Sequence, residues 1–290
     1  MTSSKSNENR RNPRPHHHHH EPSSTYQYKA HNTNHNPHHS HATHSAHLAF
    51  MPLSTMATSI SQKLRRFSCS SSVDRVSKTF IFGANTDVGK TVLSAGLCRA
   101  TPSDHDVYYV KPLQCGGSDE RFVQNHAPRT RTKTLFNWNT FSSPHTASRK
   151  EQCPVSDTEV LSTLNQHLAG IHDQATPSKP TTIWIETAGG VLSPSSASPE
   201  NNGPQHASSP SESWGWSTQA DVYRPLSTFP VVLIGDGRLG GISATLSSLE
   251  SLLIRGYNVA GILLLETGFE NHVAIREYIS RYVEERAICR

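Results

Sequence analysis

The chain has 290 residues, of which 34% are hydrophobic, and its formal net charge is +4. The positive charge comes from residues 1–78, which carry 10 Lys and Arg against 3 Asp and Glu, so residues 79–290 have a formal charge of −3. A body without a basic stripe lacks the electrostatics of a nucleic-acid-binding protein, and no run approaches the roughly 18 apolar residues needed to span a bilayer. The five cysteines show neither CxxC nor zinc spacing, which argues against a disulfide or metal framework.

The first segment of the chain has the composition of an unfolded leader. Residues 1–50 hold 12 of the 19 histidines among Asn, Ser, Pro and Thr, so no hydrophobic face can form and we expect disorder. A metal-binding histidine tract is the alternative, but spaced cysteine or carboxylate partners are missing. Residues 51–77 are rich in Ser and basic residues, which predicts an organellar transit peptide and a mitochondrial protein. A plain linker and a cytoplasmic location are the alternatives.

From residue 78 to residue 290, short β-branched runs alternate with helical patterns, which is typical of an α/β domain. The runs are almost continuously apolar, as in strands that are buried on both faces of a parallel sheet. We therefore predict a doubly wound, mostly parallel sheet with helices on both faces. The predicted strands are residues 79–82, 107–110, 182–185, 230–234 and 259–265.

Caps and apolar spacing predict the helices between these strands. Ser156 and Glu159 form an S-x-x-E capping box, so a helix should begin directly after Ser156. Apolar residues at helical spacing predict two more helices, over residues 242–253 and 273–282. Residues 193–213 contain eight serines and four prolines, and we expect a mobile surface insertion that the sheet does not need.

A phosphate-loop motif of the kind found in P-loop NTPases follows the first predicted strand. The segment from Gly83 to Thr91 reads GANTDVGKT, with Ala84 where the common pattern has its first glycine. Such a loop turns backbone N–H groups and a helix N-terminus towards polyphosphate oxygens. Lys90 would neutralise the β- and γ-phosphates of ATP and Thr91 would bind Mg²⁺, whereas a loop of ordinary turn residues is the alternative. The predicted ATP-binding residues of this loop are Asn85, Thr86, Asp87, Val88, Gly89, Lys90, Thr91 and Val92.

Two charged residues close apolar runs that should lie beside this loop. Lys111 follows residues 107–110 and Glu186 follows residues 182–185, so both side chains should meet in the crevice at the carboxyl edge of the sheet. Glu186 stands where P-loop proteins place an acidic magnesium partner, and Asp119 would add an oxygen ligand from the loop after Lys111. For Lys111 alone, a strand-end lysine that reaches solvent is the alternative. The predicted Mg²⁺ ligands are Thr91, Asp119 and Glu186.

Five blocks of the chain resemble the dethiobiotin synthetase family, over about residues 79–285. They are the GANTDVGKT loop, VKPLQCGGSDERF, the run from Trp138 to Ala147, IETAGGVLSP and GDGRLGGISATLSSLESLLIRGY. The last two are most similar to eukaryotic proteins in which the synthetase is fused to diaminopelargonate aminotransferase, so an aminotransferase domain is expected in a longer product. The resemblance implies an ATP- and Mg²⁺-dependent ligase that forms dethiobiotin from 7,8-diaminopelargonate and CO₂. It implies a homodimer, with no nucleic-acid or membrane partner.

The resemblance also implies roles for individual residues. Lys90, Lys111 and Thr86 would be catalytic, because cations let an anionic substrate carbamate approach the anionic γ-phosphate. Backbone N–H groups after Glu186 would approach nucleotide or carbamate closely. The distant substrate carboxylate would lie at a helix N-terminus of the partner subunit, with an ordinary strand-to-helix turn as the alternative. The implied ATP-binding residues are Asp119, Glu186, Thr187, Ala188 and Gly189, and the implied substrate-binding residues are Lys111, Cys115, Gly190, Leu239, Gly240, Gly241 and Ser243.

The chain departs from the family pattern at three places. Cys115 stands where the family commonly has Ser or Thr, and a thiol is the weaker hydrogen-bond donor, so weaker substrate binding is expected. Residues 262–266 read ILLLE in place of the usual segment that helps to recognise adenine, which leaves the base open. The family continues past Arg286 with another strand and a nucleotide-contacting loop, so a shortened product with an exposed apolar sheet edge is expected.

Two other functions fit parts of this pattern. A partitioning-type P-loop ATPase, which acts as a switch, would carry a second lysine five residues before Lys90, where this chain has Asn85. An inactive fragment that only binds nucleotide is the remaining alternative.

Overall fold

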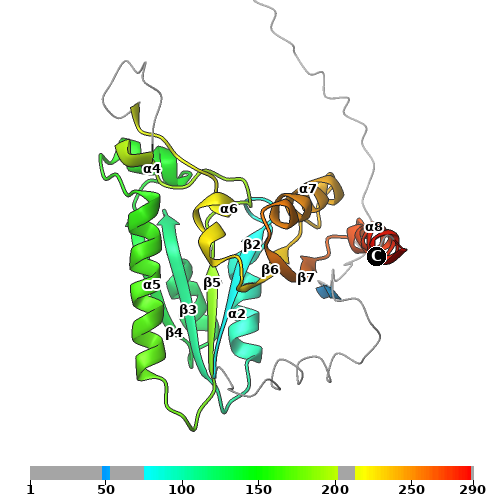
Figure 1. Ribbon diagram of the computed structural model, residues 1–290, viewed down its shortest axis with the longest axis horizontal. Coiled ribbons are helices and arrows are strands. Elements are labelled where there is room, and N and C mark those ends of the chain that lie inside the picture. The colour runs from blue at the N-terminus through cyan, green and yellow to red at the C-terminus, as the bar shows by residue number, and fades with distance from the viewer. Residues whose placement is uncertain (1–47, 53–74, 202–212, 289–290) are drawn as a thin grey trace, which may run out of the picture. The chain divides into compact units, whose positions relative to one another are not determined.

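A computed structural model of the protein describes residues 48–52, 75–201 and 213–288. These residues form a seven-stranded sheet in the order β1-β7-β6-β2-β5-β3-β4, with helices on both faces (Figure 1). Neighbouring strands run parallel except β1, which pairs antiparallel with β7 at one edge. The predicted α/β fold class is confirmed. The strands are β1 Leu48–Pro52, β2 Val76–Gly83, β3 Asp106–Cys115, β4 Arg131–Trp138, β5 Thr181–Glu186, β6 Pro230–Ile234 and β7 Asn258–Leu265.

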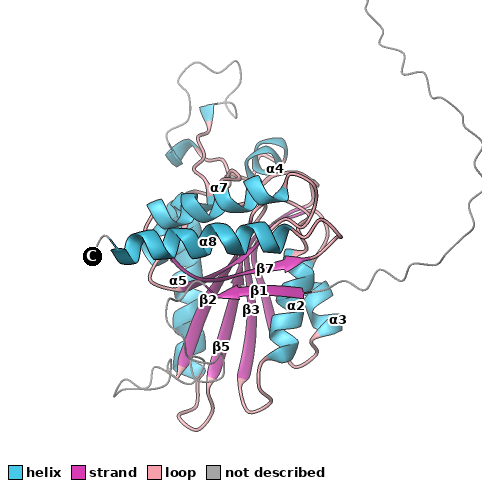
Figure 2. Ribbon diagram, turned by 90° about the vertical axis from the view of Figure 1, so that its right-hand side faces the viewer, coloured by secondary structure: helices cyan, strands magenta, loops and turns pink. Residues whose placement is uncertain are grey.

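Helices α2 and α3 cover one face of the sheet, whereas α5, α7 and α8 contribute apolar side chains to the core on the other. Helices α7 and α8 lie side by side (Figure 2). The predicted N-terminal cap is present at the start of α5, where Ser156 Oγ accepts a hydrogen bond from Glu159 N at 3.2 Å. None of the described helices is long and apolar enough to cross a membrane. The helices are α2 Lys90–Ala100, α3 Asp119–His126, α4 Pro144–Lys150, α5 Asp157–Gln174, α6 Gln219–Val222, α7 Gly241–Ile254 and α8 Asn271–Ile288, with 3-10 turns η1 Pro199–Asn201 and η3 Arg224–Leu226.

An aromatic group fills the centre of the larger core. Phe80 and Phe82 on β2 are fully buried, and their ring centroids lie 5.4 Å and 6.4 Å from that of Tyr223. Burying one phenylalanine side chain contributes about 1.5–3 kcal/mol to the free energy of unfolding, and tilted ring pairs add to it. Because β2 leads directly into the phosphate loop, this packing fixes the strand from which the candidate site is built.

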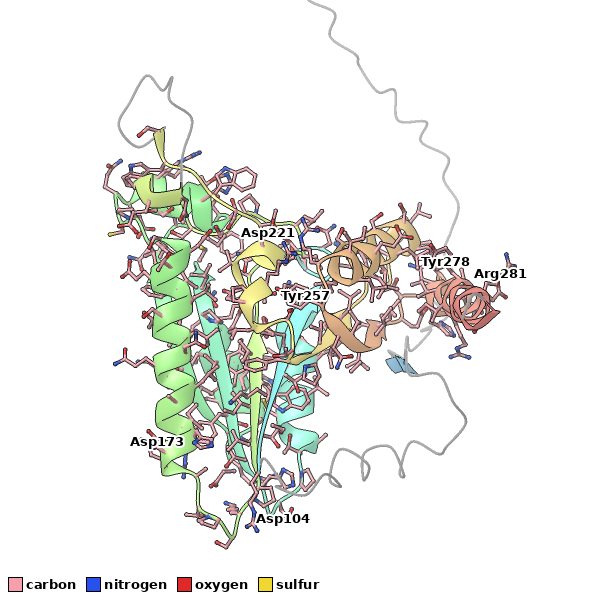
Figure 3. All side chains as sticks on the ribbon, viewed as in Figure 1. Asp104, Asp173, Asp221, Tyr257, Tyr278 and Arg281 are labelled. Carbon is pink, nitrogen blue, oxygen red and sulfur yellow. The ribbon has the colours of Figure 1, made fainter. Side chains whose placement is uncertain are left out.

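The parallel strands place their connections at two opposite ends of the sheet. Asp104 and Asp173, which precede β3 and β5 in the chain, lie at one end (Figure 3). The carboxyl ends of β2 and β5 lie at the other end, where the crevice of an open parallel sheet receives its ligands. The phosphate-loop residues follow β2 at that end.

The sheet differs from the prediction at three strands. Strand β1 lies in the expected leader and transit peptide. Its backbone pairs with β7, from Leu48 opposite Leu265 to Pro52 opposite Gly261. We expected an exposed apolar edge of the sheet, but β1 covers the edge formed by β7. Strand β4 was missed because RTKTLFNW mixes charged and apolar residues, as suits an edge strand that is only partly buried. Strand β3 continues five residues beyond its predicted end at residue 110.

The serine-rich segment is buried over residues 195–198, so the prediction of a mobile surface insertion was wrong for these residues. Ser195, Ser196 and Ala197 are fully buried, and bridges join Pro194 to Thr218 and Ser198 to Gly215. The buried hydroxyl of Ser195 is satisfied, because its Oγ donates to Asp157 Oδ1 at 3.0 Å, whereas Ser196 Oγ has no partner among the described residues. Residues 202–212 lie outside the described residues, as do the histidine-rich leader up to residue 47 and residues 53–74 of the expected transit peptide.

Candidate functional site

The phosphate loop joins β2 to α2 and has the tight geometry that such a loop needs. Gly89 has φ +85°, a left-handed conformation that favours glycine, and α2 begins at the next residue. A Cβ atom at Gly83 would lie 2.8 Å from Lys90 Cδ, so Gly83 gives the lysine its close approach, and Ala84 is accommodated in the position of the usual first glycine. The loop therefore leads into a helix N-terminus that can accept phosphate.

Lys90 is nearly buried, with 8% of its surface exposed, and its Nζ donates to the Asn85 carbonyl oxygen at 3.3 Å. Burial, together with the nearby charge of Lys111, lowers the pKa of the Lys90 amine to about 8. A phosphate bound beside Lys90 would raise this pKa and favour the charged ammonium.

We expect the affinity of the protein for ATP to fall as the pH rises through about 8, because Lys90 then loses its charge. The free energy of unfolding changes with pH in the opposite direction. The folded-state pKa lies below the unfolded value of 10.5, so burying the charged amine costs stability below pH 8 and this cost disappears as the pH rises towards 10.5. Calorimetric titration with a non-hydrolysable ATP analogue from about pH 7.5 to about 9.5 measures the affinity. A constant affinity would contradict the expectation, and K90R, whose guanidinium keeps its charge, is the control that should show no such fall.

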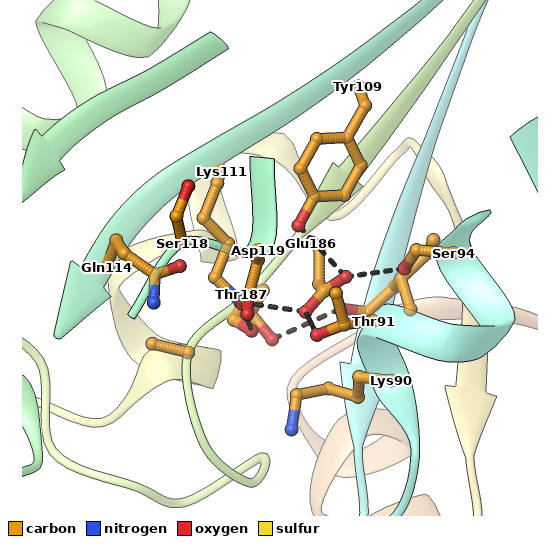
Figure 4. A network of polar contacts seen from close by, with 12 residues as sticks. Lys90, Thr91, Ser94, Tyr109, Lys111, Gln114, Ser118, Asp119, Glu186 and Thr187 are labelled. Atoms are coloured by element: carbon orange, nitrogen blue, oxygen red, sulfur yellow. Dashed lines mark hydrogen bonds and ion pairs between the residues drawn. The ribbon is translucent and has the colours of Figure 1, made fainter. Parts of the chain in front are cut away.

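Glu186, at the end of β5, is the centre of a buried hydrogen-bond network. Its carboxylate is fully buried and accepts four hydrogen bonds (Figure 4). Oε1 accepts from Lys111 Nζ at 2.8 Å and Thr91 Oγ1 at 3.1 Å, and Oε2 accepts from Ser94 Oγ at 2.6 Å and Tyr109 OH at 3.1 Å. Four donors, from α2 and β3, fix the position of this buried carboxylate. Burial and the Glu186 charge also raise the pKa of the Tyr109 hydroxyl well above its usual value.

Two members of this network, Ser94 and Tyr109, were missed in the sequence. Ser94 lies one helical turn after Lys90, on the buried side of α2, and Tyr109 lies two residues before Lys111 on β3. Residues at these spacings share a face with the predicted site residue. The spacing was therefore the available signal for both.

Lys111 is held between two carboxylates. Its Nζ lies 2.7 Å from Asp119 Oδ2 and 2.8 Å from Glu186 Oε1, and donates to the Thr187 carbonyl oxygen at 3.4 Å. Burial would lower the pKa of Lys111, but the charges of Glu186 and Asp119 outweigh it and the pKa is raised. The ammonium therefore stays protonated in an interior position.

The structure brings Lys111 and Glu186 together as predicted, but it corrects the elements on which Lys111 and Asp119 lie. Lys111 lies within β3 rather than at its end, because the two carboxylates neutralise the charge and allow the strand to continue. Asp119 is the first residue of α3 rather than part of a loop. Ser118 caps this helix, its Oγ accepting a hydrogen bond from Arg121 N at 3.1 Å.

The converging side chains fit a magnesium ion. Thr91, Asp119 and Glu186 offer one hydroxyl and two carboxylates, and an oxygen-only set with few protein ligands suits Mg²⁺, which keeps several waters and takes phosphate oxygens. Within the described ranges there is no group of three His, Cys, Asp or Glu side chains that could hold a metal by itself. A metal at this site would therefore depend on water or phosphate for its remaining ligands.

The segment after β5 lies against the phosphate loop. A Cβ atom at Gly190 would lie 3.2 Å from the Ala84 carbonyl oxygen, so the two segments are in close contact here. However, Ala188 N donates to Gln219 Oε1 at 3.3 Å and Gly190 N donates to Ser193 Oγ at 2.7 Å. These two N–H groups are thus engaged within the protein.

The remaining predicted substrate residues lie in two other places. Cys115 packs against the larger core, and burial raises the pKa of its thiol to about 12. Leu239, Gly240 and Ser243 line a pocket of about 660 Å³ between the start of α7 and α8, whereas Gly241, beside them, is not among its lining residues. None of the residues that contact Lys111 lines this pocket. The structure thus brings together Lys90, Lys111 and the three predicted metal ligands, whereas the pocket at the start of α7 is lined by other residues.

Comparison with known proteins places this site in context. Residues 77–201 match the model of an AAA domain. A bifunctional dethiobiotin synthetase/adenosylmethionine-8-amino-7-oxononanoate aminotransferase of Emericella nidulans is 38% identical over 72% of this chain and 24% of its own length. A bifunctional dethiobiotin synthetase/7,8-diamino-pelargonic acid aminotransferase of rice, Oryza sativa, named mitochondrial, is 34% identical over 70% of this chain and 29% of its own length. An ATP-dependent dethiobiotin synthetase of Brucella anthropi is 30% identical over 64% of this chain and 74% of its own length. The chain thus spans less than a third of the bifunctional relatives.

Proposed function

Because the chain belongs to the dethiobiotin synthetase family, we propose that it is an ATP- and Mg²⁺-dependent cyclo-ligase that forms dethiobiotin from 7,8-diaminopelargonate and CO₂ in biotin biosynthesis. The observation that carries the proposal is the buried Lys111, held at 2.7 Å and 2.8 Å by Asp119 and Glu186 beside a phosphate loop. A loop alone would suit any nucleotide-binding protein. A second buried cation beside it suits a reaction that joins two anions.

The proposed reaction has three steps. One amine of the diamine adds to CO₂ and loses a proton to give a carbamate. A carbamate oxygen then attacks the γ-phosphorus of ATP and releases ADP, which leaves a mixed carbamic–phosphoric anhydride. The second amine attacks the carbonyl carbon of this anhydride, loses a proton and expels phosphate, which closes the ureido ring.

The side chains of this chain would bring the two anions together. Lys90 and the N-terminus of α2 would hold the phosphates, and Lys111 would offset the charge of the carbamate as it approaches. Thr86 would donate a hydrogen bond at the same place. Mg²⁺ held by Thr91, Asp119 and Glu186 would supply positive charge to the phosphate oxygens when bound. Glu186 would also keep Lys111 oriented.

We propose that the start of α7 binds the carboxylate of a diamine substrate whose amines react in the site of a partner subunit. Leu239 is 83% exposed and Gly240 has φ +85°, so α7 begins at the surface beside a pocket. The Gly241 N–H donates to the Arg238 carbonyl oxygen at 2.9 Å, so a carboxylate would bind to the N–H groups that follow it. This role requires a homodimer. Sedimentation of a fully active monomer would contradict it.

Cys115 is proposed to weaken binding of the diamine compared with relatives that carry a hydroxyl. We expect C115T to lower KM for the diamine by about threefold, because a hydroxyl is a stronger hydrogen-bond donor than a thiol whose pKa is about 12. Steady-state kinetics at saturating ATP measures the change. C115V, which is similar in size to threonine but lacks the hydroxyl, is the control, and an unchanged or higher KM for C115T would contradict the expectation.

The names of the plant relatives suggest a cellular compartment for the protein. We propose that residues 51–77 direct it to mitochondria, as the names of the rice and Arabidopsis thaliana relatives suggest for those proteins. A fluorescent protein carrying residues 1–77 should enter mitochondria, and a diffuse cytoplasmic signal would refute this. The bifunctional relatives also suggest an aminotransferase domain as a partner in a longer product.

The test of the proposed function is whether ATP turnover depends on the diamine. A ligase should release ADP only when ATP, Mg²⁺, bicarbonate and 7,8-diaminopelargonate are all present. ADP release without the diamine would indicate a switch-type ATPase instead. No ADP under any condition would indicate an inactive nucleotide-binding fragment.

A further inference from the structure

The connection between β6 and α7 is held in place from three sides. Asn271 Nδ2 donates to the carbonyl oxygens of Asp236 at 2.9 Å and Arg238 at 2.8 Å. Thr245 Oγ1 accepts from Asp236 N at 3.0 Å. A Cβ atom at Gly241 would lie only 1.9 Å from the Asp236 carbonyl oxygen, so the turn requires glycine there. The connection therefore presents its charged side chains in fixed positions.

Asp236 and Arg238 form a two-point ion pair against the phosphate loop. Arg238 Nε and Nη2 lie 2.9 Å from Oδ1 and Oδ2 of Asp236, and Nη2 also donates to the Thr86 carbonyl oxygen at 3.2 Å. The carboxylate is buried, whereas half of the Arg238 side chain is exposed. The ion pair thus ties the phosphate loop to the β6–α7 connection at Thr86.

We propose that Arg238 is a positioning residue of the nucleotide site, which holds the phosphate loop at the Thr86 carbonyl and cancels the charge of Asp236. Neither Asp236 nor Arg238 is among the predicted site residues. The inference rests on the proposed function only through ATP binding, and it requires no particular second substrate.

The charge of Asp236 explains why the arginine is needed. A buried carboxylate next to a loop that receives polyphosphate would repel the ligand at short range. The pair of Asp236 and Arg238 is neutral. The forked guanidinium of Arg238 binds both carboxylate oxygens and also reaches the Thr86 carbonyl oxygen. Removing the arginine alone therefore leaves an unpaired negative charge, which is a worse state than removing both charges.

A double-mutant cycle, with binding of a non-hydrolysable ATP analogue as the readout, tests this inference. R238A should raise the dissociation constant about tenfold or more, because it removes the hydrogen bond to the loop and exposes the charge of Asp236. The D236N/R238A double variant lacks that charge, so it should regain most of the lost affinity. R255A is the matched control. Arg255 directly follows α7, at the end of the helix away from Arg238, and pairs with Asp221 (labelled in Figure 3) at 2.8 Å. Its analogue binding should not change.

Each other outcome has a definite meaning. An equal loss in R238A and in the double variant would overturn the inference, because a direct contact with nucleotide cannot be restored by neutralising Asp236. A lowered melting temperature with unchanged binding would overturn it as well, since the pair would then be only structural. R238K keeps the charge without the fork, should bind with intermediate affinity, and replaces R238A if that variant does not fold. Failure of the unmodified protein to bind the analogue would instead refute the proposed function.

Discussion

Replacing Lys111 with methionine is expected to reduce kcat for dethiobiotin formation by about a thousandfold or more. Methionine keeps the unbranched apolar stem of the side chain but removes the buried ammonium that lies 2.7 Å from Asp119 and 2.8 Å from Glu186. In the proposed reaction that cation offsets charge as carbamate and γ-phosphate approach, and removing such a preorganised group typically costs a factor of about 100 to 1,000 or more. Steady-state kinetics with product detected by mass spectrometry measures the loss.

Binding of ATP separates this chemical role from a loss of structure. K111M should still bind the ATP analogue, because the phosphate loop and Lys90 are intact, but more weakly, since Asp119 and Glu186 then lack their shared cation. Its far-ultraviolet circular dichroism should match that of the unmodified protein. R255A again serves as a surface cation control. A K111M variant that keeps more than about a tenth of the kcat would remove Lys111 from the proposed mechanism.

Replacing Glu186 with alanine is expected to lower the free energy of unfolding by about 3–5 kcal/mol and to abolish activity. Glu186 is fully buried and is the acceptor for four donors, on Lys111, Thr91, Ser94 and Tyr109. Alanine leaves those donors without an acceptor and leaves the Lys111 ammonium with one carboxylate in place of two. Urea denaturation followed by circular dichroism measures the free energy.

A graded pair of variants makes this prediction specific. E186Q keeps the shape and one acceptor oxygen, so it should lose less stability than E186A but should still lose activity, since a neutral amide is a poor ligand for Mg²⁺ and no counter-ion for Lys111. A loss of less than about 1 kcal/mol in E186A would show that the network contributes little to folding.

The sequence was sufficient for the parts of the fold whose physical signal is local. The apolar runs of β2, β5, β6 and β7 and the N-terminal cap at Ser156 each determine structure from a few neighbouring residues, and these elements were predicted. Strand β4 was not, because its partly exposed edge position mixes polar with apolar residues. Strand β1 was not, because five residues in a polar leader gain their strand conformation only by pairing with β7, far away in the chain.

The same distinction holds for the site. The spacing of the phosphate loop and the charges at Lys111 and Glu186 predicted the centre, because a charge within an apolar run needs a partner. Ser94 and Tyr109 are ordinary residues whose role comes from what they face. Arg238 reaches Thr86 across 152 positions in the chain. Contacts of this kind are set by the order of strands in the sheet, which places β6 next to β2, and single-sequence patterns do not contain them.

The central claim is that this chain joins CO₂ to a diamine at the expense of ATP. The direct test is to incubate the purified protein with ATP, Mg²⁺, 7,8-diaminopelargonate and ¹³C-bicarbonate, and to examine dethiobiotin by mass spectrometry with K111M in parallel. We expect dethiobiotin that is heavier by one mass unit, formed with one ADP per molecule and absent with K111M. ATP consumption without labelled dethiobiotin, or labelled product at an undiminished rate with K111M, would contradict this claim.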